Sequence, residues 1–215
     1  MDFERLYNYR FRHVDQQGRL AVWREVAPHV CRIMGEPTKM LDPAAGRGEF
    51  ISAATAEETW AVDAVRYEQA VHRPDTNVVV SPIMDATLPQ DHFDGVFISN
   101  FLEHLYDQNA IHEFLLKMRS VMAGNGTIAI MGPNYRYCSA EYWDYADHFV
   151  PLTHRAIEEH LASAGFEIDR TIPQYLPYSF SGRLPTAPWL VRLYLGIPLA
   201  WRIFGKQFLV IGRKC

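Results

Sequence analysis

The segment MLDPAAGRGEF, residues 40–50, joins an apolar strand to an acidic residue, a loop of small residues and the start of a helix. Ala44, Gly46 and Gly48 allow the backbone to approach a ligand closely, and the helix start behind them presents free backbone N–H groups. This combination indicates a nucleotide-type pocket. A tight glycine turn also occurs where a helix simply packs closely on a strand, so the segment alone leaves both interpretations open.

Acidic residues follow the first three predicted strands. Asp42 lies in the segment above, Asp63 ends the segment WAVD, and Asp85 follows the third apolar run in SPIMDATLP. The carboxyl ends of parallel strands lie side by side, where a carboxylate can accept hydrogen bonds from ribose hydroxyls. Each acid alone is also consistent with a solvated loop. Three acids in register with a glycine loop favour one common binding site.

A second group of reactive side chains follows the fifth predicted strand, in GPNYRYCSAEYWDYADHFVPLTH. Asp147 and His148 are adjacent there, and an acid beside an imidazole can orient it or raise its basicity near neutral pH. A general base is the role that this pair predicts. The alternative is that His148 fixes the loop by bonding the backbone. The remaining histidines lack paired ligand spacing, so no metal site is expected.

The elements that must position these residues follow an alternation of strand-length apolar runs with segments of helical period. This alternation is typical of βαβ units and a mainly parallel sheet. The predicted strands are 39–42, 59–63, 77–81, 93–99, 126–131, one after Gly165, and 207–213. The predicted helices are 16–35, kinked or divided at Pro28, then 48–57, 65–71, 107–122 and one from Thr153 to Gly165.

Length and composition predict one globular α/β domain, residues 1–215. A chain of 215 residues with 48% hydrophobic and 21% charged side chains is suited to a single buried core. The first residues, MDFERLYNYRFRH, contain no apolar signal region, so a cytoplasmic location is expected. Cys31, Cys138 and Cys215 lack CxxC spacing and are interpreted as ordinary thiols.

Five segments occur in an order and spacing that resemble the class I S-adenosylmethionine-dependent methyltransferases: LDPAAGRGEF, WAVDA, MDATLP, FDGVFISNFLEHL and KQFLVIGRK. The resemblance covers residues 38–172 and the last strand. It implies an α/β Rossmann-like fold, with a mainly parallel seven-stranded sheet, an antiparallel last strand and helices on both faces. It also implies S-adenosyl-L-methionine as the cofactor and methyl transfer as the activity.

The same resemblance implies roles for individual residues. The loop residues contact the methionine part of the cofactor, and they are Asp42, Ala44, Gly46 and Gly48. Asp63 binds the ribose, Asp85 holds the adenine amino group with Met84 beside the ring, and Asn100 lines the cofactor and the acceptor mouth. His104 in LEHL recurs in the family pattern and is interpreted as structural or cofactor-proximal. The chain departs from the family at Ala44, where glycine is usual.

A dinucleotide-binding dehydrogenase is the weaker alternative. Its G-x-G-x-x-G motif would need a glycine three residues after Gly48, and Ile51 stands there. A nucleic-acid substrate is not expected, because the N-terminal part of the chain is acidic and the aromatic tail lacks a dense basic groove.

The C-terminal segment 173–206 is too long and too apolar for a simple loop. Pro185, Pro188 and Pro198 break it and Arg192 and Arg202 interrupt it, so two short helices near 188–196 and 198–204 are expected rather than a membrane span. The predicted apolar surface consists of Trp189, Leu190, Leu193, Tyr194, Leu199, Trp201 and Phe204. A substrate lid, a dimer surface and a peripheral membrane contact through 184–206, at the inner face of a membrane, are the three alternatives.

Charge is distributed unevenly along the chain. From Arg170 onward there are seven basic residues and no acidic ones. This tail either faces an anionic partner, such as a phosphorylated substrate or a lipid surface, or uses its basic residues to solvate an apolar segment. Its composition resembles that of bacterial methyltransferases of polysaccharide and glycolipid assembly.

The expected reaction is therefore methyl transfer to a hydroxyl of a small sugar or glycan-type acceptor, either free or linked to a lipid or a nucleotide phosphate. The alternatives are N-methyl transfer and a catalytically silent module that only binds. The sequence leaves the acceptor and the oligomeric state open.

Overall fold

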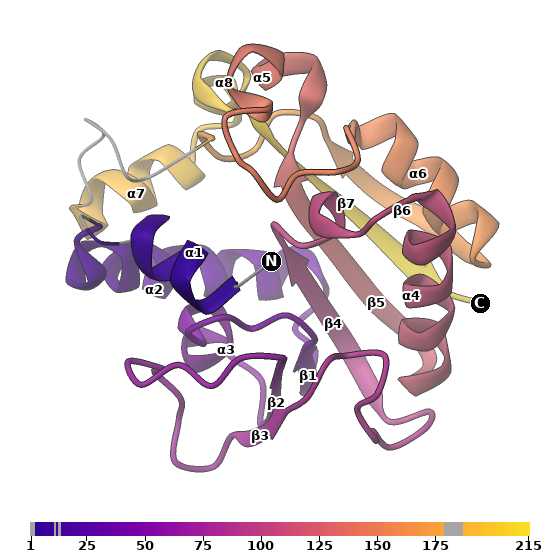
Figure 1. Cartoon of the computed structure of the whole chain (residues 1–215). Helices are drawn as coiled ribbons and strands as arrows, with labels where there is room; N and C mark the ends of the chain where they lie inside the picture. Colours follow the sequence, from indigo (N-terminus) through magenta and orange to yellow (C-terminus); the bar gives the residue numbers. More distant parts are fainter. Residues whose placement is uncertain (1–2, 11, 13, 179–186) are drawn as a thin grey trace.

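The strands form one sheet in the order β3-β2-β1-β4-β5-β7-β6 (Figure 1). The fold is taken from a computed structural model that describes residues 3–10, 12, 14–178 and 187–215. Strands β1 to β5 pair in parallel, and β7 pairs antiparallel with both β5 and β6. The strands are β1 (Lys39–Asp42), β2 (Glu58–Asp63), β3 (Asn77–Val80), β4 (Phe93–Ser99), β5 (Met122–Pro133), β6 (Phe166–Ile172) and β7 (Gln207–Lys214). This arrangement confirms the predicted fold class.

Local capping explains where several helices begin. Asp107 accepts a hydrogen bond from the Ala110 N–H ahead of α4, and Thr153 accepts one from the Ala156 N–H ahead of α6. After α6, Gly165 takes a φ of 83° and the chain turns into β6. The helices are α1 (Phe3–Arg10), α2 (Gln16–Ile33), α3 (Glu49–Ala53), the 3-10 turn η1 (Leu102–His104), α4 (Gln108–Val121), α5 (Tyr135–Tyr142), α6 (His154–Ser163), α7 (Pro188–Leu195) and α8 (Pro198–Phe204).

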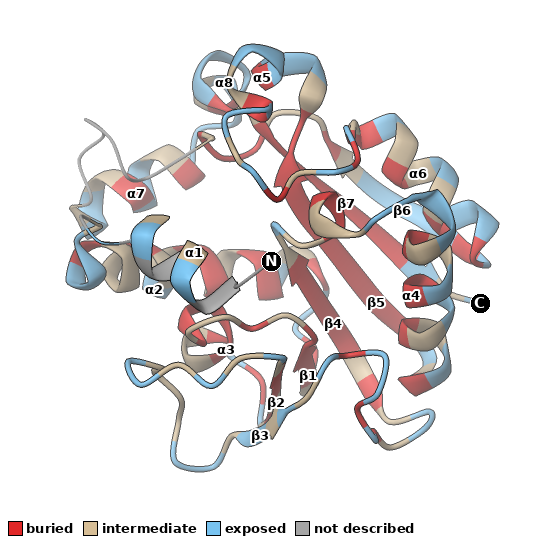
Figure 2. Ribbon diagram, in the orientation of Figure 1, coloured by how far each residue is buried: buried red, intermediate tan, exposed pale blue. Residues whose placement is uncertain are grey.

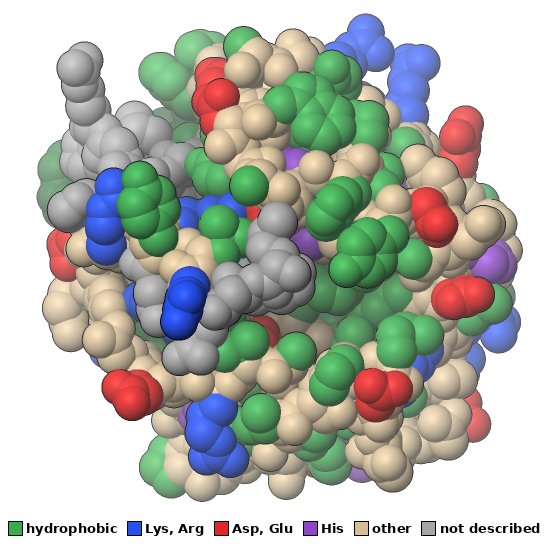
Figure 3. All heavy atoms as spheres, viewed as in Figure 1, with side chains coloured by type: hydrophobic (Ala, Val, Ile, Leu, Met, Phe, Trp, Pro, Cys, Tyr) green, Lys and Arg blue, Asp and Glu red, His purple; other side chains and the backbone are tan. Residues whose placement is uncertain are grey.

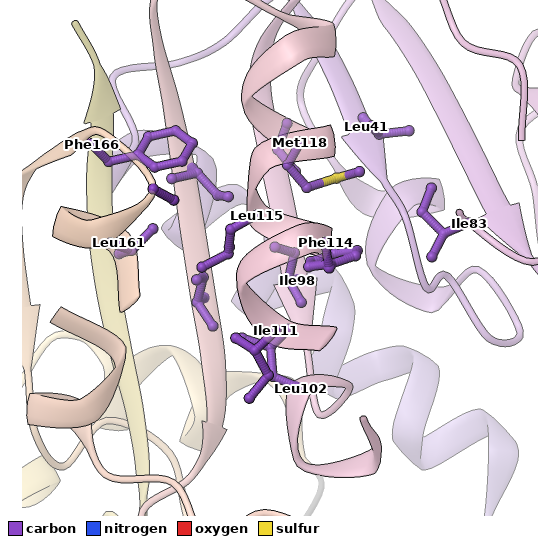
Figure 4. Close-up of a cluster of buried hydrophobic side chains, with 14 of the residues drawn as sticks. Leu41, Ile83, Ile98, Leu102, Ile111, Phe114, Leu115, Met118, Leu161 and Phe166 are labelled. Atoms are coloured by element: carbon purple, nitrogen blue, oxygen red, sulfur yellow. The ribbon is translucent and has the colours of Figure 1, made fainter. Parts of the chain in front are cut away.

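Different helices cover the two faces of the sheet. Successive side chains of a strand point to opposite faces, so Val96 and Ile98 of β4 lie on one side and Phe97 on the other. Val96 and Ile98 pack with α4 and α6, in a cluster shown in part in Figure 4. Phe97 packs with residues of α2, α3 and α7, and its ring stacks on Phe50 at 3.7 Å between centroids. Figure 2 shows the buried central strands between partly exposed helices, with the edge strand β6 largely exposed.

The prediction of a helix at 65–71 is wrong, because this segment forms turns. The N–H of Val71 donates to the carbonyl of Arg47 at 2.7 Å, so the segment binds the glycine loop instead of forming helical hydrogen bonds. Helix α3 is shorter than the predicted 48–57. Ala54 already adopts an extended conformation, because the chain must turn back to begin β2.

Three further differences concern the continuity, the bounds and the number of the elements. Helix α2 continues through Pro28 as one element, so the predicted division does not occur. A proline removes one helical hydrogen bond, and here the buried neighbours Val26 and Val30 hold both halves in the core. Strand β5 extends beyond the predicted 126–131 at both ends, and no helix is predicted where α1 and α5 form.

Helices α7 and α8 form close to their predicted positions. Helix α7 packs on α2 through buried Val191 and Leu195, and Arg192 forms an ion pair with Glu25 of α2 at 2.7 Å. Residues 179–186, which include Pro185 and the start of the predicted contact segment 184–206, lie outside the described residues.

The two tryptophans of this region differ in environment. Trp201 is only 6% exposed, and its indole N–H donates to the Tyr194 carbonyl at 2.9 Å, so the prediction that it supplies surface is wrong. Trp189, by contrast, is 67% exposed. In the parts of the chain that the structure describes, no helix has the length and apolar character needed to cross a membrane.

Candidate active site

The glycine loop, residues 43–48, connects β1 to α3. Gly46 and Gly48 have φ values of 55° and 82°, which side chains rarely adopt. A Cβ at position 48 would overlap the Val71 carbonyl oxygen and lie 2.5 Å from the His72 ring, whereas a Cβ at position 46 would meet nothing within 4 Å. Gly48 is thus required for packing, and Gly46 leaves open space beside the loop.

Asp42 ends β1 with its carboxyl group 4% exposed. One of its oxygens accepts a hydrogen bond from the Ala44 N–H at 3.3 Å. Burial raises the pKa of Asp42 to about 8, and the neighbouring charges of Asp63 and Glu49 contribute to the rise. A cationic group placed beside Asp42 would favour its ionised form.

Asp63 ends β2, and its carboxylate holds the glycine loop. Its two oxygens accept hydrogen bonds from the N–H groups of Gly46 at 2.8 Å and Val65 at 2.9 Å. Burial raises the pKa of Asp63, and these N–H donors oppose that rise. Each carboxylate oxygen can accept a second hydrogen bond, so the same group can also receive a ribose hydroxyl.

A cavity of about 470 Å³ opens at the carboxyl ends of β1, β2 and β4. Such a volume is ordinary for a small-molecule site. On the face drawn in Figure 3, hydrophobic side chains surround a hollow. Residues of four predicted segments line the cavity, and they are Asp42, Ala44, Gly46, Asp63, Met84 and Asn100. A smaller cavity of about 300 Å³ shares Gly46 and Asp63 with it.

The turn after β3 places Met84 and Asp85 differently. Met84 lines the larger cavity, and the Lys117 ammonium of α4 fastens the turn by donating to the carbonyls of Met84 at 2.7 Å and Ala86 at 2.9 Å. Asp85 is exposed and does not line the cavity. Its contact with an adenine amino group stays a prediction. Asn100, by contrast, lines the cavity directly after β4, with a φ of 49°.

Asp147 is fully buried in the loop after α5 and binds residues distant in the sequence. Both of its carboxylate oxygens accept hydrogen bonds from the Arg10 guanidinium, and its backbone carbonyl lies 2.8 Å from His104 Nδ1. Burial alone would raise the pKa of Asp147, but the Arg10 hydrogen bonds and the nearby charges of His104 and Arg10 lower it below its ordinary value.

His148 lies behind His104 instead of at the cavity wall. Its ring is 5.0 Å from the His104 ring and 4.7 Å from the Tyr142 ring, and it stacks on Tyr145. Burial lowers the pKa of His148 to about 4, the opposite of the expected rise in basicity, although the Asp147 charge acts to raise it. The catalytic role of His148 stays a prediction.

Several cavity residues come from outside the predicted set, and they are Arg10, Arg19, Trp23, Glu49, Tyr67 and His104. Arg10 and Trp23 lie on α1 and α2, which reach the site only through tertiary packing. The LEHL motif indicated that His104 is structural or close to the cofactor, but the sequence could not show that its side chain lines the cavity.

Residues 41–130 match a family model described as a methyltransferase domain. No curated protein sequence matches the chain. A solved S-adenosylmethionine-dependent methyltransferase from Archaeoglobus fulgidus is similar to it with a TM-score of 0.60 and 20% identity, covering 99% of this chain and 100% of that chain. One from Thermotoga maritima has a TM-score of 0.65 and 14% identity, covering 99% and 96%.

A third solved structure is the 1,6-didemethyltoxoflavin-N1-methyltransferase of Burkholderia thailandensis with S-adenosylhomocysteine bound. Its TM-score is 0.59 at 17% identity, covering 99% of this chain and 89% of that chain. The shared architecture is the class I methyltransferase fold. The domain match covers residues 41–130, which therefore resemble a methyltransferase domain, and S-adenosylmethionine is the cofactor that this match and the shared fold support.

The residues present fit this cofactor. The methionine part of S-adenosylmethionine carries an ammonium group and a sulfonium. The carboxyl groups of Asp42 and Asp63 line the cavity, whereas that of Glu49 is paired with Arg19. The raised pKa of Asp42 is the cost of burying a carboxyl group among like charges, and a cationic ligand offsets that cost.

Proposed function

We propose that the protein methylates a hydroxyl of a small sugar or glycan-type acceptor, and that residues 1–215 act as one domain for this reaction. S-adenosylmethionine supplies a methyl group on a sulfonium, which is a good leaving group. The chain's own contribution is therefore to align the acceptor oxygen with that methyl group and to ease loss of the hydroxyl proton.

The cofactor-binding assignments are part of this proposal. Asp63 receives the ribose hydroxyls, Met84 contacts the adenine ring and Asp85 approaches the adenine amino group. Asn100 lies near the boundary between cofactor and acceptor. The methionine part lies along the first strand end and the loop, at Asp42, Ala44, Gly46 and Gly48, with Gly48 acting through the loop's shape.

One observation carries the choice of a hydroxyl acceptor: the cavity continues from the glycine loop to His104. His104 Nδ1 donates to the Asp147 carbonyl at 2.8 Å, which leaves Nε2 to interact with an acceptor oxygen. Asp147 is thus a positioning residue for His104, and His148 supports the same ring from behind. A neutral amine acceptor would need little such help.

Cofactor binding is tested by calorimetry with S-adenosylmethionine. Asp63→Ala should weaken binding by about 1–3 kcal/mol, because buried hydrogen bonds are lost. Asp169→Ala removes a partly exposed carboxylate of β6 and serves as the control, with unchanged affinity expected. Absence of binding to the native chain at millimolar cofactor would contradict the proposal.

The acceptor atom is tested with a cofactor carrying a ¹³C-labelled methyl group and a panel of sugar, nucleotide-sugar and amine acceptors. The carbon chemical shift distinguishes O-methyl from N-methyl products. An O-methyl sugar is the expected result. An N-methyl product would establish the N-methyltransferase alternative, and cofactor binding without turnover of any acceptor would favour a silent binding module.

We also propose that α7 and α8 contact an anionic membrane surface, at the cytoplasmic face. Exposed apolar side chains support this, and they are Trp189, Leu193, Ile197, Leu199, Ile203 and Phe204. Acidic residues are missing from Arg170 onward in the sequence, which suits an anionic lipid surface. The Arg192–Glu25 ion pair and the buried face of α7 hold these side chains outward. This anchoring favours a membrane contact over a lid.

A further inference from the structure

Three side chains with metal-ligating atoms meet behind the acceptor end of the cavity: Glu103, His104 and His148. One such atom from each lies within 4.8 Å of the other two. The sequence predicts no metal site, because its histidines lack paired ligand spacing. Glu103 and His104 lie in η1, whereas His148 lies beyond α5, so only the fold brings the three together.

Backbone contacts fix the two segments to each other. The carbonyl of Glu103 accepts hydrogen bonds from the N–H groups of Phe149 at 2.8 Å and Val150 at 3.3 Å. The hydroxyl of buried Tyr142 donates to the Val150 carbonyl at 2.6 Å and accepts from the Leu152 N–H at 3.2 Å. The cluster therefore rests on a hydrogen-bonded frame, as a preorganised ligand set requires.

The histidines have ring nitrogens left for a ligand. His104 Nδ1 is engaged by the Asp147 carbonyl, so its Nε2 carries the lone pair. His148 Nδ1 is buried and has no hydrogen-bond partner among the residues that the structure describes. A buried polar nitrogen without a partner is costly in a folded protein.

Glu103 is a buried acidic residue without a basic partner in the described part of the chain. It is 2% exposed, and within the described ranges it forms no ion pair with a lysine or arginine. The Arg10 guanidinium is bound to the second buried carboxylate, Asp147. Two carboxyl groups thus accompany one arginine, an arrangement that a cation balances.

We propose that Glu103, His104 and His148 bind a divalent first-row transition cation such as Zn²⁺ or Mn²⁺ beside the acceptor. Two imidazoles and one carboxylate form a ligand set suited to these ions, whereas Mg²⁺ prefers oxygen ligands alone. The hydrogen bond from His104 to the Asp147 carbonyl is the support that metal-bound histidines usually receive.

This site deepens the proposed function and rests on it, because His104 lines the cavity that receives the acceptor. With the cation bound, His104 Nε2 holds the cation and acts on the acceptor oxygen through it. A hydroxyl that reaches the cation becomes more acidic and releases its proton to solvent water. Its oxygen then forms the bond to the methyl carbon as the carbon–sulfur bond breaks, which leaves the neutral thioether. The favoured acceptor class is a sugar with two neighbouring hydroxyls, because two oxygens can share the open positions of the cation.

The test uses the full chain without an affinity tag, first treated with a chelator. Titration with ZnCl₂ by calorimetry, and with CoCl₂ by visible absorption, should show one ion per chain and a ligand-field band from nitrogen ligands. Glu103→Gln and His148→Ala should each weaken Zn²⁺ binding by at least about tenfold. Glu103→Gln keeps the shape of the side chain, so it decides the matter if His148→Ala fails to fold.

His92→Ala is the matched control. His92 lies just before β4, at the opposite end from η1, where its Nε2 is 2.9 Å from the Glu58 carboxylate, so it forms a histidine–carboxylate pair outside the cluster. Unchanged Zn²⁺ affinity is expected there. Equal losses in His92→Ala and Glu103→Gln, or full binding by a folded Glu103→Gln chain, would overturn the site. Retained S-adenosylmethionine binding without Zn²⁺ binding would overturn the metal site alone, whereas absent cofactor binding would count against the proposed function.

Discussion

The carboxylate of Asp147 binds the guanidinium of Arg10 and not the ring of its sequence neighbour His148. This contact ties α1 to the loop after α5, two segments separated by most of the chain. His104 completes the arrangement through the Asp147 carbonyl. The N-terminal helix therefore helps to hold the wall of the acceptor site.

Arg10→Ala should destabilise the fold by about 3–5 kcal/mol, because it leaves the buried Asp147 carboxylate without its main partner. Urea unfolding measures the loss. Combining it with Asp147→Asn should recover part of the stability. Arg192→Ala is the control, since the Arg192–Glu25 pair is largely exposed at the arginine and should contribute far less to stability. Equal effects of the two arginine variants would contradict this account.

The raised pKa of Asp42 predicts a pH-dependent stability of the cofactor-free protein. Between the ordinary pKa of 3.8 and about 8, the folded chain keeps a proton that the unfolded chain has released. The free energy of unfolding should therefore fall as pH rises through this window, by up to about 1.4 kcal/mol per pH unit. The groups facing Asp42 are Asp63 and Glu49, both of like charge.

Asp42→Asn should remove that slope, which denaturant titrations from pH 5 to pH 8 would reveal. The affinity for S-adenosylmethionine should rise with pH over the same range in the native chain, because the cationic ligand favours the ionised carboxylate. The variant should bind more weakly with a flatter pH profile. An unchanged slope in the variant would show that Asp42 is not the responsible group.

Two glycines of one loop should respond differently to alanine. At Gly48 the new Cβ would overlap the Val71 carbonyl, and we expect a loss above about 2 kcal/mol, since strain from positive φ adds to the steric conflict. Gly46→Ala carries only the φ cost of about 1 kcal/mol. Thermal unfolding of the two variants measures the difference. Similar losses would indicate that the loop relaxes freely.

Trp189 and Trp201 should separate membrane binding from folding. Trp189→Ser should leave stability within about 0.5 kcal/mol but reduce flotation with anionic liposomes at low salt. Trp201→Ser should instead cost about 3–5 kcal/mol, because the ring is buried against Tyr175 and His29. If the native chain does not float at low salt, a lid or a dimer contact remains for α7 and α8.

Buried apolar runs made the central sheet readable from sequence: β1 and β4 begin and end where the pattern predicts them. The 65–71 segment shows where local pattern fails. Its backbone forms a hydrogen bond with Arg47, a residue more than twenty positions away. The hydrophobic periodicity within the segment cannot predict such a contact. Trp189 and Trp201 likewise read alike in sequence, and only packing against α2 and the sheet distinguishes them.

The cofactor side of the site was more predictable than the acceptor side. Asp42, Asp63 and the glycine loop follow strands, and parallel strand ends converge by geometry alone. Arg10, Glu103 and His148 converge through loops and an N-terminal helix, whose placement depends on tertiary contacts. Residue type indicated that His148 could do chemistry, but sequence could not show that its neighbours are His104 and Tyr142.

The position of β7 sets the order in which the sheet can be completed. Strand β6 precedes β7 in the chain, yet its partner in the sheet is β7, which lies between it and β5. Strands β1 to β5 can pair with one another before Gln207–Lys214 exist, whereas β6 must wait for them. Pairings between strands that are distant in the sequence form slowly, and an unpaired strand edge can bind other chains. During synthesis, the edge of β6 is therefore open to misassociation and to chaperones until β7 has been made.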